Sequence, residues 1–226
     1  MRKRFNEQLE ELHLDLIKMG ALCEDIIDAS MKALFEKDSA MVKKAESIES
    51  DINDMERTIE NSCMKLLLQQ QPVARDLRTI SSALKMISDM ERIGDQAEDI
   101  AEITEYIADD KIIGEHYLRQ MSKAASKMVT DAIESFVKHD TELATSVIMY
   151  DNTVDELFQK MKSELIEEIA SDRTKGETCF DIMMIAKYIE RIGDHAENVA
   201  EWVIYSVTGV HPTKRNVEGE LEVTLS

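Results

Sequence analysis

The sequence is poor in the residues that interrupt helices. Its 226 residues include only two prolines and seven glycines, well below the roughly 5% and 7% of average usage. Aromatic residues make up 5% of the chain, whereas charged residues make up 32%. Because proline and glycine disfavour helix interiors while Glu, Lys, Leu, Met and Ala suit them, the composition predicts an all-α protein.

Long apolar runs and paired cysteines are also missing. No stretch of about 18 apolar residues occurs, so we expect neither a membrane span nor direct membrane insertion. The segment MRKRFNEQLEELHLDL (1–16) starts with basic residues but has no apolar core, which argues against a signal peptide. Cys23, Cys63 and Cys179 form no CxxC pattern. Free cysteines suit a reducing compartment, so we expect a cytoplasmic protein.

The charge balance is strongly acidic, with a formal net charge of −19. Such a surface repels nucleic acid, whose affinity for proteins depends on Lys and Arg contacts to phosphate, so no nucleic-acid partner is expected. It attracts cations and basic protein surfaces instead. Because the chain has no Gly-rich phosphate loop, GxSxG or HExxH motif, nothing in it indicates an enzyme.

Helix-ending signals divide the chain into six helical segments. Asp38 or Ser39 is a candidate N-cap, Pro72 ends one helix or opens the next, and Gly176 follows several capping residues. The expected helices span roughly 6–36, 40–69, 75–108, 115–138, 141–170 and 178–207.

The chain also contains an internal repeat. ERIGDQAEDIAE (91–102) returns as ERIGDHAENVAE (190–201), with nine of the twelve positions identical. ALFEKDSA (33–40) corresponds to SFVKHDTE (135–142) in its position within the repeat and in its helix-ending residues. Each repeat therefore holds three helices, and duplication by itself implies no activity. We predict two tandem three-helix bundles, with domains at 1–110 and 111–208 and a loosely held tail at 209–226.

The third helix of each repeat has an apolar seam with heptad spacing. In the first repeat the seam is Ile80, Ala83, Ile87, Met90, Gly94, Ala97, Ala101 and Thr104. In the second it is Cys179, Ile182, Ala186, Ile189, Gly193, Ala196, Ala200 and Val203. A glycine in mid-helix costs about 1 kcal/mol relative to Ala, so we interpret Gly94 and Gly193 as points where another helix packs closely.

Acidic residues follow one flank of these helices. The first block places Glu91, Asp95, Glu98 and Glu102 on one stripe, and the preceding helix carries Glu49, Asn53, Glu56 and Glu60 on the matching flank. Two helices joined by a short loop run antiparallel. Counting outward from Pro72 puts four oxygen-bearing side chains at one level: Glu49, Asn53, Glu91 and Asp95. The same count in the second repeat groups Asp151, Asp155, Glu190 and Asp194.

Facing carboxylates repel one another, and a cation removes that repulsion. Carboxylate and amide oxygens suit Mg, Ca, Mn or Fe, so the two groups are candidate metal sites; the alternative is a solvated acidic face. His195 lies within the second block and is either a surface residue or a support for a ligand. The Glu-x-x-His spacing of ferritin-like di-iron proteins occurs once, at Glu10 and His13, outside the acidic blocks.

These motifs resemble the PhoU family. The resemblance rests on the doubled ERIGDxAE, on QPVARDLR (71–78) and on the acidic pairs, and covers roughly residues 5–208. It implies two bundles related by pseudo-twofold symmetry, whose E/D-x-x-x-D motifs hold iron or zinc clusters. The matching positions are Glu91 with Asp95, Asp151 with Asp155, Glu190 with Asp194, and Glu49 with Asn53. Asn53 replaces the expected Asp, so the first site loses one charge.

The resemblance also implies a regulatory role. PhoU-like proteins are thought to link the ATPase subunit of a phosphate ABC transporter to a sensor histidine kinase, and to keep the phosphate-starvation response off when phosphate is plentiful. We therefore expect a metal-binding negative regulator of phosphate uptake, without enzymatic activity, that forms a homodimer. Two alternatives stay open: a carboxylate-bridged metalloenzyme and a metal-free helical scaffold.

Overall fold

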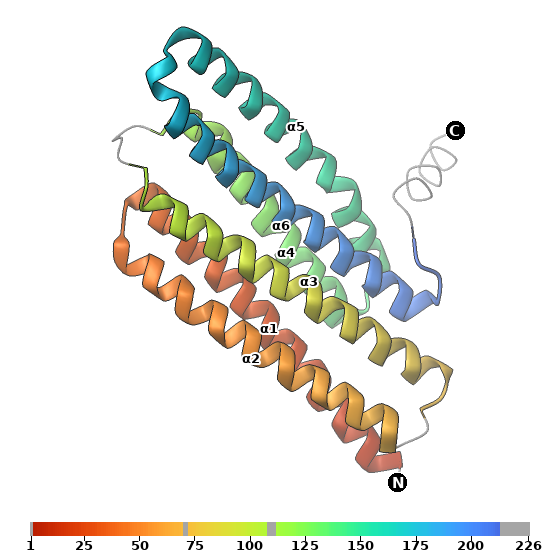
Figure 1. Cartoon of the computed structure of the whole chain (residues 1–226). Helices are drawn as coiled ribbons and strands as arrows, with labels where there is room; N and C mark the ends of the chain where they lie inside the picture. Colours follow the sequence, from red (N-terminus) through yellow and green to blue (C-terminus); the bar gives the residue numbers. More distant parts are fainter. Residues whose placement is uncertain (1, 70–71, 108–111, 213–226) are drawn as a thin grey trace, which may run out of the picture.

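The computed structural model describes residues 2–69, 72–107 and 112–212, and these segments are mainly helical (Figure 1). Six long helices and one short 3₁₀ turn follow one another along the chain. Their bounds are α1 Arg2–Glu36, α2 Ser39–Gln69, α3 Ala74–Thr104, α4 Glu115–Lys138, α5 Thr141–Ser171, η1 Arg173–Lys175 and α6 Gly176–Thr208. The predicted all-α class and the six helices are confirmed.

The helices form two three-helix bundles that lie side by side. Helices α1, α2 and α3 pack on one another, as do α4, α5 and α6, while α3 against α6 and α1 against α4 join the two bundles (Figure 1). Near its start, α3 meets the end of α6, where Arg78 contacts Gly209. Further along α3, the carboxylate of Asp99 accepts a hydrogen bond from the hydroxyl of Tyr188 in the first half of α6. The two central helices are therefore antiparallel, as a pseudo-twofold axis between the repeats requires.

The predicted helix ends hold within four residues, and two of them differ by that much. The third helix was expected to reach residue 108, but it ends at Thr104. The chain then continues in turns with hydrogen bonds between residues three apart: Tyr106 N–H donates to the carbonyl of Ile103, and Ile107 N–H donates to that of Thr104. The first helix begins at Arg2 rather than at residue 6, since Phe5 is buried in the core and extends the packed face.

Aspartates cap the N-termini of two helices. The carboxylate of Asp38 accepts the Ala40 N–H at 2.9 Å, and Asp140 accepts the N–H groups of Glu142 and Leu143 at 3.0 Å. Each satisfies donors that the first helical turn leaves unpaired.

The predicted seams form the core. Except for half-buried Thr104, the seam residues of both repeats are buried. A Cβ on Gly94 would lie 3.0 Å from Cδ1 of Ile52 on α2, and one on Gly193 would lie 3.7 Å from Cγ1 of Val154 on α5. Ile52 and Val154 occupy matching positions of the two repeats. Both glycines therefore lie at contacts between helices, but the predicted close approach is confirmed only at Gly94, because a Cβ on Gly193 would make an ordinary contact.

Two predictions about the chain's segments fall outside the described residues. The predicted domain boundary, between 110 and 111, lies in 108–111, and most of the predicted loose tail lies in 213–226. Among the described helices, none combines the length and hydrophobicity that crossing a bilayer requires.

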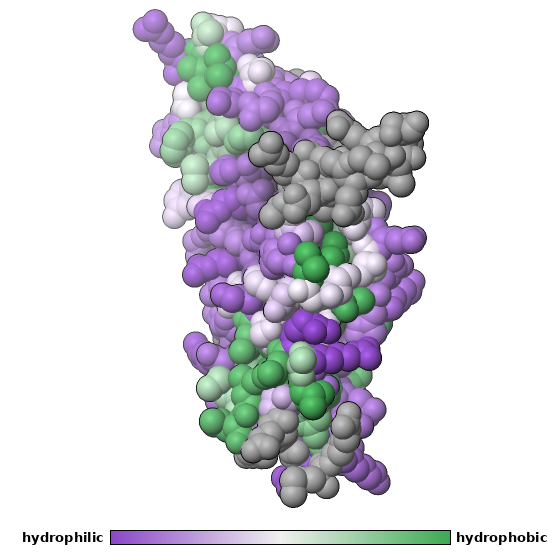
Figure 2. Space-filling model, turned by 90° about the vertical axis from the view of Figure 1, so that its right-hand side faces the viewer, coloured by the Kyte–Doolittle hydropathy of each residue, from purple (hydrophilic) through white to green (hydrophobic). Residues whose placement is uncertain are grey.

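One patch of exposed apolar side chains lies at the end of the molecule where α2 meets α3, called here the apolar end. Met64, Leu68, Val73 and Leu77, around the α2–α3 connection, are exposed by 46%, 80%, 53% and 44%. Figure 2 shows apolar surface over the lower part of the face it presents, where Figure 1 places this end of α2 and α3. Such a patch on an otherwise acidic protein is a candidate contact surface for another protein.

Candidate functional site: two carboxylate clusters

The first cluster lies where α2 faces α3. The contact of Ile52 with Gly94 brings the flanks of these helices together and places Glu49 and Asn53 opposite Glu91 and Asp95. The amide of Asn53 donates to the carboxylate of Glu49. On α3 itself, the guanidinium nitrogens of Arg92 lie 2.8 Å from the carboxylate of Asp95 and 3.4 Å from that of Glu91. The arginine thus offsets part of the negative charge.

Partial burial and crowding make these carboxylates harder to ionise. Burial raises the pKa of Glu91, with further contributions from Asp95, Glu56 and Glu49, while Arg92 opposes the shift. Two turns beyond Glu91 on α3, burial and then Glu49 raise the pKa of Glu98 to about 7, helped by Glu102. The influence of Glu49 on both residues agrees with the predicted level of the acids across the helix pair.

The second cluster, between α5 and α6, is the more buried. Asp151 and Glu190 expose only 2% and 8% of their surface. Burial raises the pKa of Asp194 to about 6, and Glu190, Asp151 and Asp155 add to the shift, whereas Lys187 opposes it. The other three acids predicted for this repeat therefore all act on Asp194. The ammonium group of Lys187 donates to the carboxylate of Glu190.

The donor chemistry of the clusters suits a hard cation, but the side chains are not gathered around one point. Within residues 2–69, 72–107 and 112–212, no three His, Cys, Asp or Glu side chains stand close enough together to hold a metal ion. Ion pairs explain part of why the carboxylates do not converge, since Arg92 pairs with Asp95 and Lys187 pairs with Glu190. Coordination therefore needs these ion pairs to open and the carboxylates to turn toward one another.

His195 joins the two bundles. Its Nδ1 lies 2.9 Å from Oδ1 of Asp89 on α3, and the amide of Asn198 donates to the same oxygen at 3.0 Å. The sequence alone suggested a surface residue or a support for a metal ligand; the structure places His195 in the contact between α3 and α6, with its side chain 18% exposed. Asp89 was missed because the periodicity of one helix does not specify which side chain of another bundle it meets.

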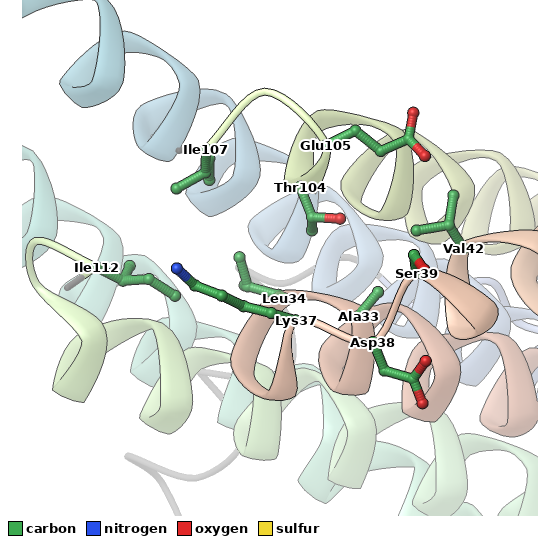
Figure 3. Close-up of a pocket in the computed structure, with 10 residues that line it drawn as sticks. All are labelled: Ala33, Leu34, Lys37, Asp38, Ser39, Val42, Thr104, Glu105, Ile107 and Ile112. Carbon is green, nitrogen blue, oxygen red and sulfur yellow. The ribbon is translucent and has the colours of Figure 1, made fainter. Parts of the chain in front are cut away.

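Several pockets lie away from the acidic clusters. A hollow of about 140 Å³ at the α1–α2 turn has Lys37 extending across it toward Ile112 (Figure 3). Its lining is Ala33, Leu34, Lys37, Asp38, Ser39, Val42, Thr104, Glu105, Ile107 and Ile112. A second pocket, of about 520 Å³, lies where α1, α3 and α4 meet.

These features define a class of helical protein: a duplicated three-helix bundle with an acidic cluster in each repeat. The family model described as PhoU domain matches residues 16–104 and 118–203, one match in each repeat. The chain belongs to the PhoU family.

Relatives and solved structures agree with this assignment. The chain is 36% identical to the "Phosphate-specific transport system accessory protein PhoU homolog" of Pseudomonas aeruginosa, over 92% of this chain and 86% of the relative. It is 35% identical to the protein of the same name from Clostridium acetobutylicum, over 92% and 96%. The crystal structure of PhoU from Pseudomonas aeruginosa superimposes with a TM-score of 0.88 at 36% identity, over 91% of this chain and 100% of that one.

A more distant structure shows the same architecture. The phosphate transport system regulatory protein PhoU from Streptococcus pneumoniae gives a TM-score of 0.86 at 27% identity, over 92% of this chain and 99% of that one. The duplicated bundle is therefore kept across relatives that differ at most positions.

Proposed function

We propose that this protein is an accessory regulator of a phosphate transport system, which restrains phosphate uptake and phosphate-starvation signalling when phosphate is abundant. The observation that carries the proposal is the match of both repeats to the PhoU domain, together with relatives named as accessory proteins of that system. In this proposal the protein contacts the ATPase subunit of the transporter and the cytoplasmic part of a sensor histidine kinase in the cytoplasm, and works as a homodimer.

Protein contact rather than catalysis is the proposed mode of action. The apolar end of the molecule, with Leu68 exposed by 80% and Val73 by 53%, offers a surface that a partner can cover. The net charge of −19 favours encounter with basic partner surfaces. Together they support a regulator that associates through a charged surface with an apolar contact.

The carboxylate clusters are proposed to bind metal ions. The residues that would hold them are Glu49, Asn53, Glu91 and Asp95 in the first repeat and Asp151, Asp155, Glu190 and Asp194 in the second. Mutual repulsion supports the proposal, since the raised pKa of Asp194 reflects burial beside other acids, and a bound cation relieves that repulsion. Iron or zinc is the proposed metal, with Mg, Mn and Ca as the other candidates for oxygen donors.

A deletion strain tests the regulatory role. In phosphate-rich medium, loss of the gene is expected to switch on a phosphate-starvation reporter, and the wild-type gene supplied in trans is expected to restore repression. A copy carrying Glu190→Gln with Asp194→Asn separates the metal site from the regulatory role. Normal repression in the deletion strain, together with no binding of the purified protein to either proposed partner, contradicts the proposal.

The two alternatives give different results. A carboxylate-bridged metalloenzyme shows metal-dependent turnover that is lost in Glu91→Gln. A metal-free scaffold melts at the same temperature with and without added metal ions.

A further inference from the structure

The pocket between the two bundles contains a pair of histidines. It occupies about 520 Å³ where the first half of α1, the start of α3 and the end of α4 meet. Five of its lining residues are apolar, and its polar members are Glu10, His13, Arg75, Asp76, Thr79 and His139. The pocket lies apart from the two carboxylate clusters, whose residues do not contribute to its lining.

The histidines come from different repeats and face each other. The centroids of the His13 and His139 rings are 6.0 Å apart, and His13 also stacks on Phe136 at 4.7 Å. His139 follows the last turn of α4 in the left-handed conformation, with φ 53°. Because this backbone conformation ends the helix, it turns the His139 side chain back across the end of α4 toward α1.

Glu10 shares the pocket with His13. The two residues are three apart on α1, a spacing that places both side chains on one face of the helix. They form the Glu-x-x-His motif that the carboxylate clusters leave unused. Asp76, in the first turn of α3, brings a second carboxylate to the same pocket, while Arg75 brings a cation.

The environment favours the form of His13 that binds metal. Burial lowers its pKa, and repulsion from a charged His139 lowers it further. The other ionisable groups that face the pair are Glu10, Arg75 and Asp76. A neutral imidazole has a free nitrogen lone pair, which is the form that coordinates Zn²⁺ and Ni²⁺.

We propose that this pocket binds a borderline divalent transition metal ion, Zn²⁺ or Ni²⁺, through His13 of α1 and His139 of α4, with Glu10 as the third ligand. Zn–N bonds of 2.0–2.1 Å place the centroids of two imidazoles on one tetrahedral ion about 5 Å apart. The observed 6.0 Å therefore needs a relative ring movement of about 1 Å. Glu10 also has to turn toward the ion, because no three such side chains are assembled around one point in the described part of the chain.

Such an ion would tie the first repeat to the second. His13 belongs to the α1–α3 bundle and His139 to the α4–α6 bundle, and α1 packs against α4 across the boundary between them. Coordination by both residues therefore stabilises one relative position of the two bundles. This site differs in chemistry from the carboxylate clusters, because its nitrogen donors suit Zn²⁺ and Ni²⁺ but not Mg²⁺ or Ca²⁺.

The first experiment is calorimetric titration of the full chain with Ni²⁺ at pH 7.5. We compare the parent with His13→Gln, with His139→Asn, which tolerates the left-handed backbone, and with the control His116→Gln outside the pocket. Each pocket variant is expected to weaken one class of site by at least about tenfold, since even residues that only support a ligand contribute about 10–100-fold to metal affinity. The control is expected to bind as the parent does.

A second experiment keeps the proposal testable if a variant folds poorly. Imidazole ¹H–¹⁵N spectra of the parent protein are recorded during addition of Zn²⁺, and the His13 and His139 resonances are expected to shift together before those of His116. Binding at this pair is also expected to persist in Glu190→Gln with Asp194→Asn, which separates it from the proposed carboxylate sites. Unshifted His13 and His139 resonances, or unchanged Ni²⁺ affinity in folded His13→Gln and His139→Asn, overturn the proposal.

Discussion

The carboxylate of Asp89 and the imidazole of His195 connect the two central helices: Oδ1 of Asp89 lies 2.9 Å from Nδ1 of His195. The same oxygen accepts a hydrogen bond from Asn198 at 3.0 Å. One side chain of α3 therefore holds two side chains of α6. Both His195 and Asp89 are mostly buried, with side chains 18% and 16% exposed, so the contact is shielded from water.

Asp89→Ala is expected to weaken the contact between the bundles. The change leaves two partly buried α6 groups without their acceptor, which costs about 1–3 kcal/mol. Urea unfolding followed by circular dichroism measures the loss. Asp54→Ala is the matched control, because Asp54 is exposed and pairs with Arg57 on the same helix. Equal unfolding midpoints for the two variants would show that the Asp89 contact contributes no more than a surface ion pair.

The mid-helix glycines are expected to tolerate a methyl group differently. At Gly193 an added Cβ meets Asp151 at 3.5 Å, an ordinary contact, so Gly193→Ala gains up to about 1 kcal/mol of helix propensity. At Gly94 an added Cβ would lie 3.0 Å from Ile52, and this steric crowding offsets part of the gain in helix propensity. Leucine at either position overpacks the seam and destabilises by about 1–3 kcal/mol. The melting temperatures of the four variants, with alanine or leucine at each position, test these expectations. If both leucine variants melt at the temperature of the parent, the glycines do not pack against the facing helices as described.

Much of this fold follows from the periodicity of single helices, whereas contacts between the repeats do not. The seam and the levels of the acids follow from heptad spacing and from the turn at Pro72. Gly20 gave no such signal, yet a Cβ there would lie 2.7 Å from Ile133 on α4. Its partner belongs to the other bundle, and the pattern of α1 alone contains no information about that neighbour. The ion pairs of Arg92 and Lys187 were missed for a related reason: spacing locates a side chain on a face but does not choose its rotamer.

Glu98 is expected to make stability depend on pH. Its pKa is raised from 4.5 to about 7, chiefly by burial and then by Glu49 and other acids. The folded protein therefore binds a proton more tightly than the unfolded chain, so this contribution to stability is fully present below about pH 4.5 and is lost as pH rises through 7. With chelator present, Glu98→Gln should raise the melting temperature at pH 8 but not at pH 4.5. Glu105→Gln, beyond the end of α3, is the control, and an equal effect of Glu98→Gln at both pH values contradicts the burial argument.

The second carboxylate cluster is expected to lose metal binding without losing stability. Glu190→Gln with Asp194→Asn removes two crowded charges, so the metal-free variant should melt at or above the temperature of the parent. A ligand at 100 times its dissociation constant stabilises the parent by about 2.7 kcal/mol, and the variant should lack the part of this shift that comes from the second repeat. Differential scanning calorimetry with and without iron or zinc measures both effects. A full metal-induced shift in the double variant shows that Glu190 and Asp194 are not ligands.

The apolar end of the molecule is expected to contribute to partner binding. Leu68 and Leu77 are exposed by 80% and 44%, so Leu68→Ser with Leu77→Ser changes the surface with little effect on the core. Covering an apolar side chain of this size contributes about 1.5–3 kcal/mol when it is fully buried, so the double variant should bind the transporter ATPase at least about tenfold more weakly. Surface plasmon resonance with the purified subunit measures the affinity.

Salt separates the contributions of charge and of apolar contact to this binding. Because screening weakens attraction between charged surfaces, raising the salt concentration should slow association of the parent and of the Leu68→Ser/Leu77→Ser variant by the same factor. The difference in dissociation rate between them should persist at high salt, since apolar burial is not screened. Tyr106→Ser changes a side chain that is 75% exposed at the other end of α3 and serves as the matched control. Equal affinities for the leucine and tyrosine variants would place the contact surface elsewhere on the molecule.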